Sequence, residues 1–146
     1  MDTIAAVLQE KGTQIFTVSP TTTAQEAAQT MVKHNVGSVL VVEAGKPIGI
    51  FSERDLMVRV VVPGKDPKKV EVREVMTGGV AVVEPHTRVK QAMAIMTEKR
   101  CRHLPVVAEG KIVGLVSIGD LVRWLSKDQE FQIRMLEHYI VGSYPG

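Results

Sequence analysis

Short apolar runs and amphipathic helical patterns alternate along this chain in one order that occurs twice. Each copy starts with an apolar stretch, at residues 15–18 or 80–83, and a proline follows two positions later. Apolar residues then recur at the three- and four-residue spacing of a helix that buries one face. Two more apolar runs, separated by a turn, and a second helix complete each copy. The repeated order β-α-β-β-α predicts a mixed α/β protein of the α+β class.

A fixed offset of 65 residues aligns the two copies without a gap, placing Val18–Leu56 on Val83–Leu121. Thirteen of these 39 aligned positions are identical, whereas unrelated segments of ordinary composition match at about one position in fifteen to twenty. The chain is therefore a duplication. We divide it into a first repeat with an N-terminal helix at 1–62, a linker at 63–71, a second repeat at 72–126, and a C-terminal helix and tail at 127–146.

Residues typical of helix caps mark the ends of the first helix in the N-terminal repeat. Thr22 with Gln25, or Thr23 with Glu26, has the spacing of a capping box. Asn35 favours the left-handed backbone that ends many helices. These signals predict a helix that starts after one of the two threonines and ends before the asparagine.

A single repeat of about 60 residues rarely buries enough apolar surface to fold alone. We therefore expect the two repeats to pack against each other with pseudo-two-fold symmetry. A duplicated unit creates two equivalent clefts at its internal interface, and such interfaces are favoured places for ligands. The sequence thus predicts two candidate binding sites.

Each repeat carries a Ser-x-x-Asp element, Ser52–Asp55 or Ser117–Asp120, between its last strand and its second helix. One interpretation is structural, because the serine can cap the helix while the acid complements its positive N-terminus. The other is functional, because a helix N-terminus and a serine hydroxyl suit a phosphate, and the aspartate can accept from both ribose hydroxyls. The spacing alone leaves both interpretations open.

Glycine and apolar residues near these elements fit the functional interpretation. Gly49 and Gly114 precede the serines and allow a ligand or a neighbouring strand to approach closely, although they can equally serve the turn. Adenine requires an apolar slot with free backbone edges. In this interpretation the slot comes from the first strands of the two copies, at Ile15, Phe16, Val80 and Ala81.

These features together resemble one known family. Both repeats carry the pattern G-x-x-x-G-x-x-S-x-x-D-L, and Val75–Thr77 and Arg102–Val107 are also similar to that family. Over residues 4–126 the chain resembles a tandem pair of CBS domains (a Bateman module), named after cystathionine β-synthase. It looks like a two-repeat protein of the bacterial kind with no other domain attached.

The resemblance implies regulatory binding of AMP, ADP or ATP, or of NAD or S-adenosylmethionine, in the clefts between the repeats. It assigns Asp55 and Asp120 to the ribose, and it places the backbone of Ile15 and Val80 against adenine. It puts the following residues on the phosphate side: Ser52, Ser117, Arg54, Arg102, His103 and Thr77. It also implies a homodimer, and an unidentified regulated protein is a further possible partner.

The two clefts differ in chemistry at matching positions. Where the second repeat has Arg102 and His103, the first has Gly37 and Ser38, which we group with the adenine slot. Arg54 has a glycine as its counterpart. We therefore expect unequal nucleotide affinities, which calorimetry measures. His103 is either a satisfied structural side chain or a phosphate contact, and in the second case binding strengthens as the pH falls toward about 6.5.

Composition and charge limit the cysteine chemistry, the location and the partners that we expect. The chain has 146 residues, of which 45% are apolar and 23% charged, with a net charge of +2 and a single cysteine, Cys101. An intramolecular disulfide and a cysteine metal cluster are thereby excluded, which fits a reducing cytoplasm. No apolar run approaches the roughly 20 residues needed to cross a bilayer, and the N-terminus lacks the pattern of a signal peptide. We expect a cytoplasmic protein with neither a membrane nor a nucleic-acid partner.

The sequence lacks the motifs that mark common enzyme classes. It contains no nucleophile elbow, no phosphate-binding glycine loop, no Cys-x-x-Cys and no histidine pair at metal-ligand spacing. We therefore expect no catalysis, no metal and no catalytic cofactor. The rival function is a scaffold or oligomerisation protein with vestigial clefts. Residues 122–140 predict a continuing helix with an apolar stripe, which we expect to pack on its own domain or a dimer mate, or else to dock on a partner.

Overall fold

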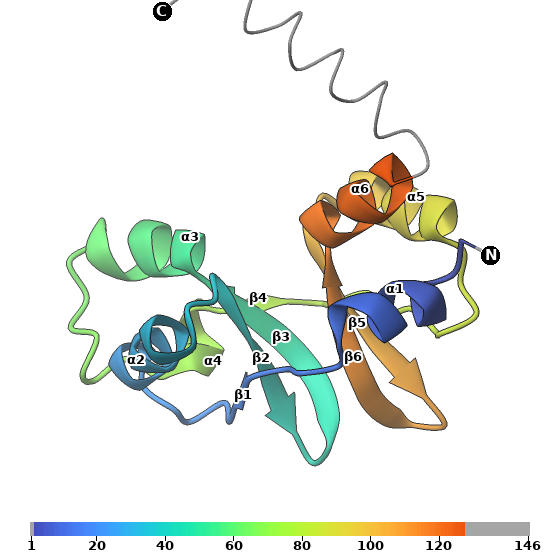
Figure 1. Ribbon diagram of the computed structural model, residues 1–146. Coiled ribbons are helices and arrows are strands. Elements are labelled where there is room, and N and C mark those ends of the chain that lie inside the picture. The colour runs from blue at the N-terminus through green and yellow to red at the C-terminus, as the bar shows by residue number, and fades with distance from the viewer. Residues whose placement is uncertain (1, 128–146) are drawn as a thin grey trace, which may run out of the picture.

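The computed structural model describes residues 2–127 and confirms the α+β class (Figure 1). The element order is duplicated except at residues 80–83, where the predicted first strand of the second repeat is reduced to an isolated bridge between Val83 and Val106. The first half contains β1 (Thr17–Val18), α2 (Ala24–His34), β2 (Ser38–Glu43), β3 (Lys46–Ser52), α3 (Glu53–Asp55) and the π-helix η1 (Leu56–Val61). The second half contains α5 (Val89–Lys99), β5 (His103–Ala108), β6 (Lys111–Ser117) and α6 (Ile118–Ser126). The remaining elements are α1 (Ile4–Lys11), α4 (Val72–Val75) and β4 (Thr77–Gly78). Beyond α6, the predicted C-terminal helix and tail lie outside the described residues, apart from Lys127.

Helix α2 forms because one of the two possible capping boxes closes at its start. The Thr23 hydroxyl accepts the Glu26 backbone N–H at 3.2 Å, and the Glu26 carboxylate accepts the Thr23 N–H at 3.1 Å. Asn35 ends the helix with φ 55°, in the left-handed region. The apolar positions at helical spacing, Ala24, Ala27 and Met31, are buried. The predicted helix is therefore present with its predicted caps.

The two halves share one hairpin geometry. Strands β2 and β3 pair antiparallel, as do β5 and β6, and the register is the same at the 65-residue offset, with Leu40 opposite Ile50 and Pro105 opposite Leu115. Both hairpins turn through two residues with positive φ, the Ala-Gly pair at 44–45 and the Glu-Gly pair at 109–110. A two-residue turn of this kind matches the right-handed twist of the strands. In the first half β1 and β4 extend the hairpin to a sheet of order β1-β2-β3-β4.

Each half has its own hydrophobic core, and a further buried layer lies between the hairpins. Val39, Val41 and Phe51 face the core of the first half. Because side chains alternate along a strand, Leu40 and Ile50 point to the opposite face of the same hairpin, where they are also buried. Strand β3 contacts β6 on this side, so the hairpins meet at the centre of the molecule (Figure 1).

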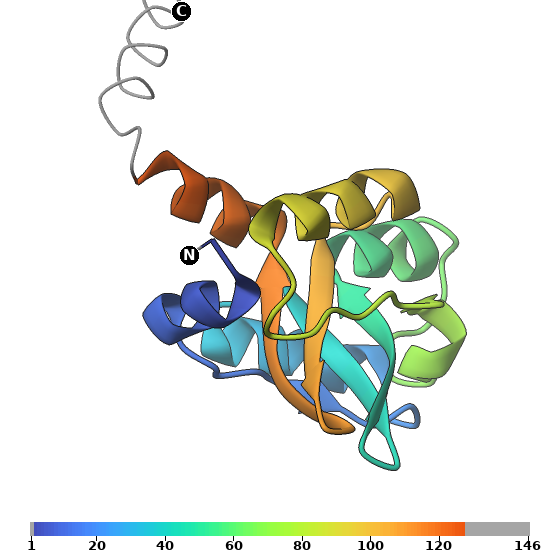
Figure 2. The ribbon, with the colours of Figure 1, turned by 90° about the vertical axis from the view of Figure 1, so that its right-hand side faces the viewer.

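The helices that precede the two repeats are exchanged between the halves. Helix α1 packs on β6 and α6 of the second half through Ile4, Val7 and Leu8 (Figure 2). Helix α4 packs in the first half through Val72 and Val75. The division of the sequence at 1–62 and 72–126 groups each helix with the repeat that follows it, whereas in space each completes the core of the other repeat.

The glycines before the Ser-x-x-Asp elements make room for these exchanged helices. A Cβ atom on Gly114 would lie 2.7 Å from the Leu8 side chain, and one on Gly49 would collide with the sulfur of Met76. Both glycines lie within strands, on the face that an apolar side chain from α1 or the end of α4 covers. The close approach that we predicted at these glycines is therefore made by the chain itself.

Candidate functional site

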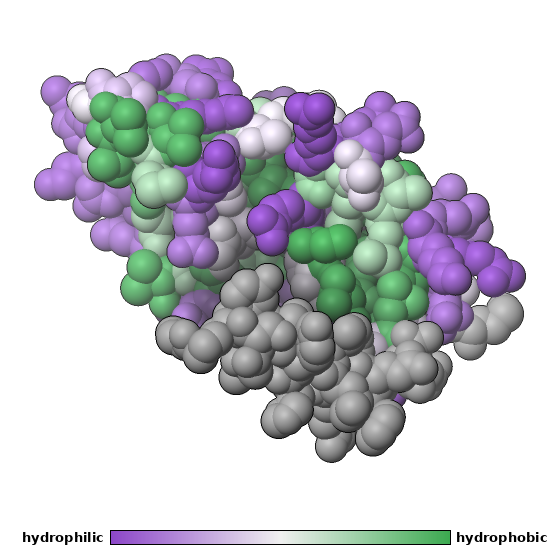
Figure 3. All heavy atoms as spheres, turned by 90° about the horizontal axis from the view of Figure 1, so that it is seen from above, coloured by the Kyte–Doolittle hydropathy of each residue, from purple (hydrophilic) through white to green (hydrophobic). Residues whose placement is uncertain are grey.

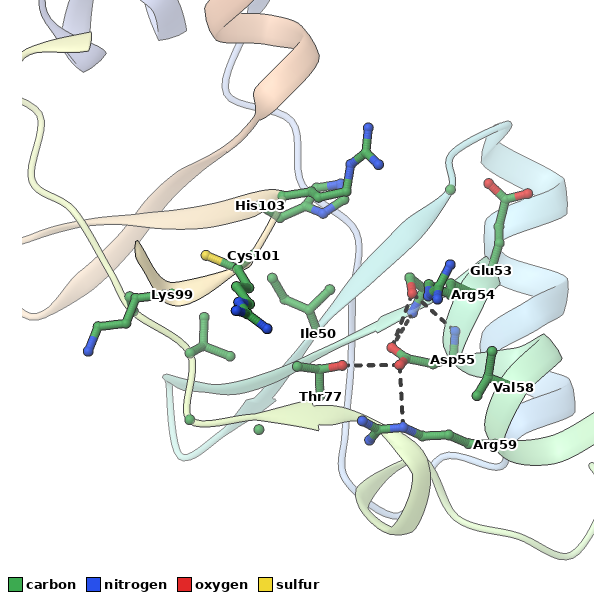
Figure 4. Close-up of a pocket in the computed structure, with 18 residues that line it drawn as sticks. Ile50, Glu53, Arg54, Asp55, Val58, Arg59, Thr77, Lys99, Cys101 and His103 are labelled. Carbon is green, nitrogen blue, oxygen red and sulfur yellow. Dashed lines mark hydrogen bonds and ion pairs between the residues drawn. The ribbon is translucent and has the colours of Figure 1, made fainter. Parts of the chain in front are cut away.

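A cavity of about 820 Å³ is lined by both halves of the molecule (Figure 4). One wall is formed by the end of β3, α3 and η1, including Ser52–Asp55, Val58 and Arg59. Strand β4, at the edge of the same sheet, adds Thr77 and Gly78, and the opposite wall comes from residues 79–81 and 99–103. The volume lies in the range of small-molecule pockets, which commonly occur at interfaces between domains.

Most of the predicted site residues line this one cavity. Nine of them do so: Gly37, Ser52, Arg54, Asp55, Thr77, Val80, Ala81, Arg102 and His103. The other five do not line it: Ile15, Phe16, Ser38, Ser117 and Asp120. The cleft thus combines the Ser-x-x-Asp element of the first repeat with residues 80–81 and the basic segment of the second repeat.

The Ser52–Asp55 element forms its helix cap and still points a carboxylate oxygen towards the cavity. Asp55 Oδ2 accepts hydrogen bonds from the Ser52 backbone N–H at 3.0 Å and the Ser52 hydroxyl at 3.1 Å. Asp55 Oδ1 accepts the Thr77 hydroxyl at 3.0 Å, and Arg59 Nε lies 3.8 Å away (Figure 4). At Asp55 the structural and functional interpretations are therefore compatible, because they use different carboxylate oxygens. The Ser52 hydroxyl, by contrast, already donates its one proton within the cap.

Positive charge dominates the lining of the cavity. The acidic residues are Glu53 and Asp55, and the basic ones are Arg54, Arg59, Lys99, Arg100 and Arg102. Clefts lined by one sign of charge concentrate ligands of the opposite sign, and arginine binds phosphate oxygens in pairs. This charge distribution suits an organic anion such as a nucleotide.

The Ser117–Asp120 element of the second repeat makes different contacts from those of Ser52–Asp55. Asp120 Oδ2 accepts the Lys11 ammonium at 2.7 Å and the Ser117 backbone N–H at 2.8 Å, while Oδ1 accepts Arg123 Nη2 at 2.7 Å. Burial by itself raises the pKa of the Asp120 carboxyl, but the bonds from Lys11 and Ser117 outweigh it and hold that pKa below its usual value. Asp120 also lines a smaller cavity of about 340 Å³, together with Val7, Glu10, Lys11, Arg123, Trp124 and Lys127.

The residues predicted to form the adenine slot also differ between the two sites. Phe16 stacks on His34, with ring centroids 3.9 Å apart and an interplanar angle of 16°. Their counterparts at the 65-residue offset, Ala81 and Lys99, instead line the larger cavity. The smaller alanine leaves space where the other repeat carries an aromatic pair. Unequal affinity of the two clefts remains our prediction.

His103 lies on β5 beside Ser117, with which it pairs in the β5–β6 register, and it lines the larger cavity. Burial lowers the pKa of the His103 imidazole, the nearby Asp120 charge opposes this shift, and Lys11 and Arg102 reinforce it. The neutral imidazole is thus favoured in the folded protein.

We expect the free energy of unfolding to decrease between about pH 7.5 and 5.5, and His103→Gln to remove part of this decrease. The unfolded chain takes up a proton at a pKa of about 6.5, whereas folded His103 takes it up only at lower pH. The unfolded state is therefore favoured as the pH falls through 6.5, and the loss of stability ends below the folded pKa. Urea titrations of both proteins at the two pH values measure the effect. The same pH dependence in both would contradict this prediction.

Several residues of the two sites were not predicted from the sequence. Arg59 and Arg123 lie four and three positions after the aspartates that they contact, and this helical spacing is a signal that could have identified them. Lys99 and Arg100 extend the basic run before His103. Lys11 offered no local signal, because it lies 109 residues from its partner.

The described part of the chain meets the requirements neither of a metal site nor of a membrane-spanning helix. Among residues 2–127, no group of three or more His, Cys, Asp or Glu side chains is placed to hold a metal ion. Over the same range, each helix is too short or too polar to span a bilayer.

This protein is thus a tandem-repeat module, in which two copies of an α+β unit enclose a basic cleft large enough for a small-molecule ligand. The chain belongs to the CBS-domain family, whose model matches residues 12–62 and 72–127. Both halves are therefore CBS domains, as the repeated G-x-x-x-G-x-x-S-x-x-D-L pattern and the segments at 75–77 and 102–107 indicated.

Relatives of known structure or sequence share this organisation. A putative signal-transduction protein with CBS domains from Burkholderia ambifaria is 40% identical, with a TM-score of 0.81 over 87% of this chain and 96% of that one. The CBS domain-containing protein YhcV of Bacillus subtilis is 37% identical over 118 residues, which cover 81% of this chain and 84% of YhcV. The CBS domain-containing protein CBSX3 of Arabidopsis thaliana is 37% identical over 84% of this chain, and the match spans 62% of CBSX3.

Proposed function

We propose that this chain is a regulatory, non-catalytic module that binds an adenine nucleotide in the cavity between its two CBS domains. The observation that carries this proposal is the composition of one cavity. Asp55 and Thr77 line it together with the apolar residues Val80 and Ala81 and with more basic than acidic side chains. Each of these groups suits a different part of a nucleotide. They come from opposite repeats, so a bound ligand would link the two halves.

The chemistry of the lining assigns a role to each group. Asp55 is proposed to accept hydrogen bonds from the ribose hydroxyls, because a carboxylate offers several acceptor sites. Arg54 and Arg102 would bind the phosphates, and the Ser52 hydroxyl would join them by turning its proton away from Asp55 Oδ2. The backbone of Val80–Ala81 and the side chain of Ile50, which line the same cavity, would form the adenine slot.

A structural relative supports a nucleotide ligand in this family. The CBS domain protein PAE2072 from Pyrobaculum aerophilum was solved complexed with AMP, and it has the same fold, with a TM-score of 0.71 and 24% identity to this chain. AMP is therefore the first ligand to test here, followed by ADP, ATP, NAD and S-adenosylmethionine.

A thermal-shift panel of these compounds, with guanine nucleotides as controls, tests the proposal. A ligand present at 100 times its Kd adds about 2.7 kcal/mol to the stability of the folded state. We expect one of the adenine compounds to raise the melting temperature by several degrees and the guanine nucleotides to have less effect. No shift with any adenine compound would overturn the proposal and favour the scaffold function.

An exposed apolar surface supports assembly into a homodimer, which we propose alongside nucleotide binding. Met57, Val58 and Val61 on η1 and Val62 beyond it are 46–76% exposed. Figure 3 shows apolar side chains exposed in the view from above, near the end of the molecule that carries α3 in Figure 1. Large contiguous apolar patches commonly mark protein interfaces.

We expect Val61→Glu to shift the protein from dimer towards monomer, because a charge at the centre of an apolar interface is costly to bury. Val32→Glu is the matched control, since Val32 is 82% exposed on α2, a separate helix. Sedimentation velocity measures the change. A monomeric wild-type protein, or a dimer that Val61→Glu leaves intact, would contradict this assignment.

A further inference from the structure

The two clefts differ because the exchanged helices have different lengths. Helix α1 has eight residues and α4 has four. They enter the two halves in the same way, since Ile4 N–H donates to the Thr87 carbonyl and Val72 N–H donates to the Thr22 carbonyl, both at 2.8 Å. The start of α1 is therefore the structural counterpart of α4.

After this common start, the chain takes two different courses. Beyond α4 it becomes extended at Met76 and enters β4, which brings the Thr77 hydroxyl to Asp55. Helix α1 instead continues for another turn and ends only at Gly12. That extra turn carries Lys11 to Asp120, where a threonine hydroxyl stands in the first cleft.

The carboxylates of Asp55 and Asp120 consequently have different partners. The Lys11 ammonium lies 2.7 Å from Asp120 Oδ2 and also donates to the Leu115 carbonyl at 2.8 Å. Arg123 binds the other oxygen at 2.7 Å. Asp55 Oδ1, by contrast, accepts a neutral hydroxyl and has its nearest cation, Arg59, at 3.8 Å.

We propose that Lys11 closes the second cleft by occupying the carboxylate of Asp120, so that this chain binds a single nucleotide. This inference rests on the proposed function of the first cleft and adds a residue that sets the stoichiometry. Hydrogen bonds between two charged groups are stronger than those between a charged and a neutral group. A ribose hydroxyl therefore displaces the Thr77 hydroxyl from Asp55 more readily than it displaces an ammonium from Asp120.

The stoichiometry of nucleotide binding tests this proposal. Calorimetric titrations with AMP and with ATP are made on the full chain, on Lys11→Met, and on Lys46→Met as the matched control, because Lys46 is an exposed lysine at the start of β3. We expect one nucleotide per chain for the wild type and for the control, and two for Lys11→Met. Adding Asp120→Asn to Lys11→Met should return the stoichiometry to one.

Trp124 provides an independent readout, because it is the only tryptophan of the chain and lines the cavity with Lys11 and Asp120. Its fluorescence should respond to nucleotide in Lys11→Met but not in the wild type. Lys11→Gln serves as a second variant, because it keeps a long polar side chain on the helix. A folded Lys11 variant that gains no site would overturn the inference, as would a wild type that binds two nucleotides and loses one with Asp120→Asn.

The two proposals fail in different ways in this experiment. A wild type that binds no nucleotide overturns the proposed function, while the Trp124 titration of the Lys11 variants still decides whether the second cleft opens. A wild type that binds one nucleotide, together with Lys11 variants that also bind one, leaves the proposed function standing and overturns the role of Lys11.

Discussion

Replacing Asp55 with asparagine is expected to weaken binding of an adenine nucleotide by about 10- to 100-fold. A hydrogen bond to a charged group contributes about 1.5–3 kcal/mol, and 1.4 kcal/mol corresponds to a tenfold change in affinity. The asparagine keeps the shape of the side chain and an oxygen for the cap with Ser52, but it loses the charge and replaces one acceptor with a donor. Calorimetry with the nucleotide that gives the largest thermal shift measures the change.

Asp120→Asn is the matched control, because it makes the same substitution in the same Ser-x-x-Asp cap. We expect the affinity of this variant to stay within about twofold of the wild type, since Lys11 and Arg123 occupy that carboxylate. The melting temperatures of both variants without ligand report any damage to the fold. No loss of affinity in Asp55→Asn would show that the ribose does not bind at Asp55, and an equal loss in both variants would contradict the difference between the two carboxylates.

The hairpins and first helices could be predicted from the sequence because local rules determine them. A glycine between two apolar runs marks each two-residue turn, at 44–45 and at 109–110, and it adopts the positive φ that its position requires. The burial of Ala24, Ala27 and Met31 follows from their helical spacing. In such segments the pattern of the chain and the final structure agree, because each residue interacts mainly with its neighbours in sequence.

The exchange of α1 and α4 could not be predicted in this way. An apolar face shows that a helix is buried, but the same face fits the core of either repeat because the repeats are copies of each other. The division of the chain by sequence order therefore placed Ile4 with the first repeat, whereas its backbone N–H bonds to Thr87 in the second. Gly49 and Gly114 did indicate a close approach, but their sequence context does not say what approaches them.

The candidate site could likewise be predicted from the sequence only in part. Ser52 and Asp55 were identified from a short motif, and the matching serine and aspartate of the second repeat carry an identical motif. Their difference in the folded protein depends on Lys11, whose distance of 109 residues from Asp120 places it beyond any local pattern. A repeat thus predicts where two sites lie, while contacts from outside the repeat decide whether they are equivalent.

Ile4→Ala is expected to lower the free energy of unfolding by about 2–5 kcal/mol, the range for truncating a large apolar side chain in a core. This effect is large for a residue so close to the N-terminus, where changes are usually tolerated unless the segment is packed. Ile4 is fully buried, and it lies in one core cluster with Leu104 and Leu121 of the second half. Val32→Ala is the control, because Val32 is 82% exposed and should change stability by less than about 0.5 kcal/mol. Urea unfolding measures both variants.

Amide hydrogen exchange shows where the stability is lost. Since α1 covers the second half, Ile4→Ala should speed exchange in β5 and β6 more than in β2 and β3, although Ile4 precedes the first repeat in sequence. Val72→Ala on α4 should have the opposite pattern, because Val72 is fully buried in the core of the first half. Faster exchange confined to the repeat that follows each helix in sequence would contradict the exchange of helices. The reciprocal pattern would establish that each CBS domain of this chain is stabilised by a helix that precedes the other in sequence.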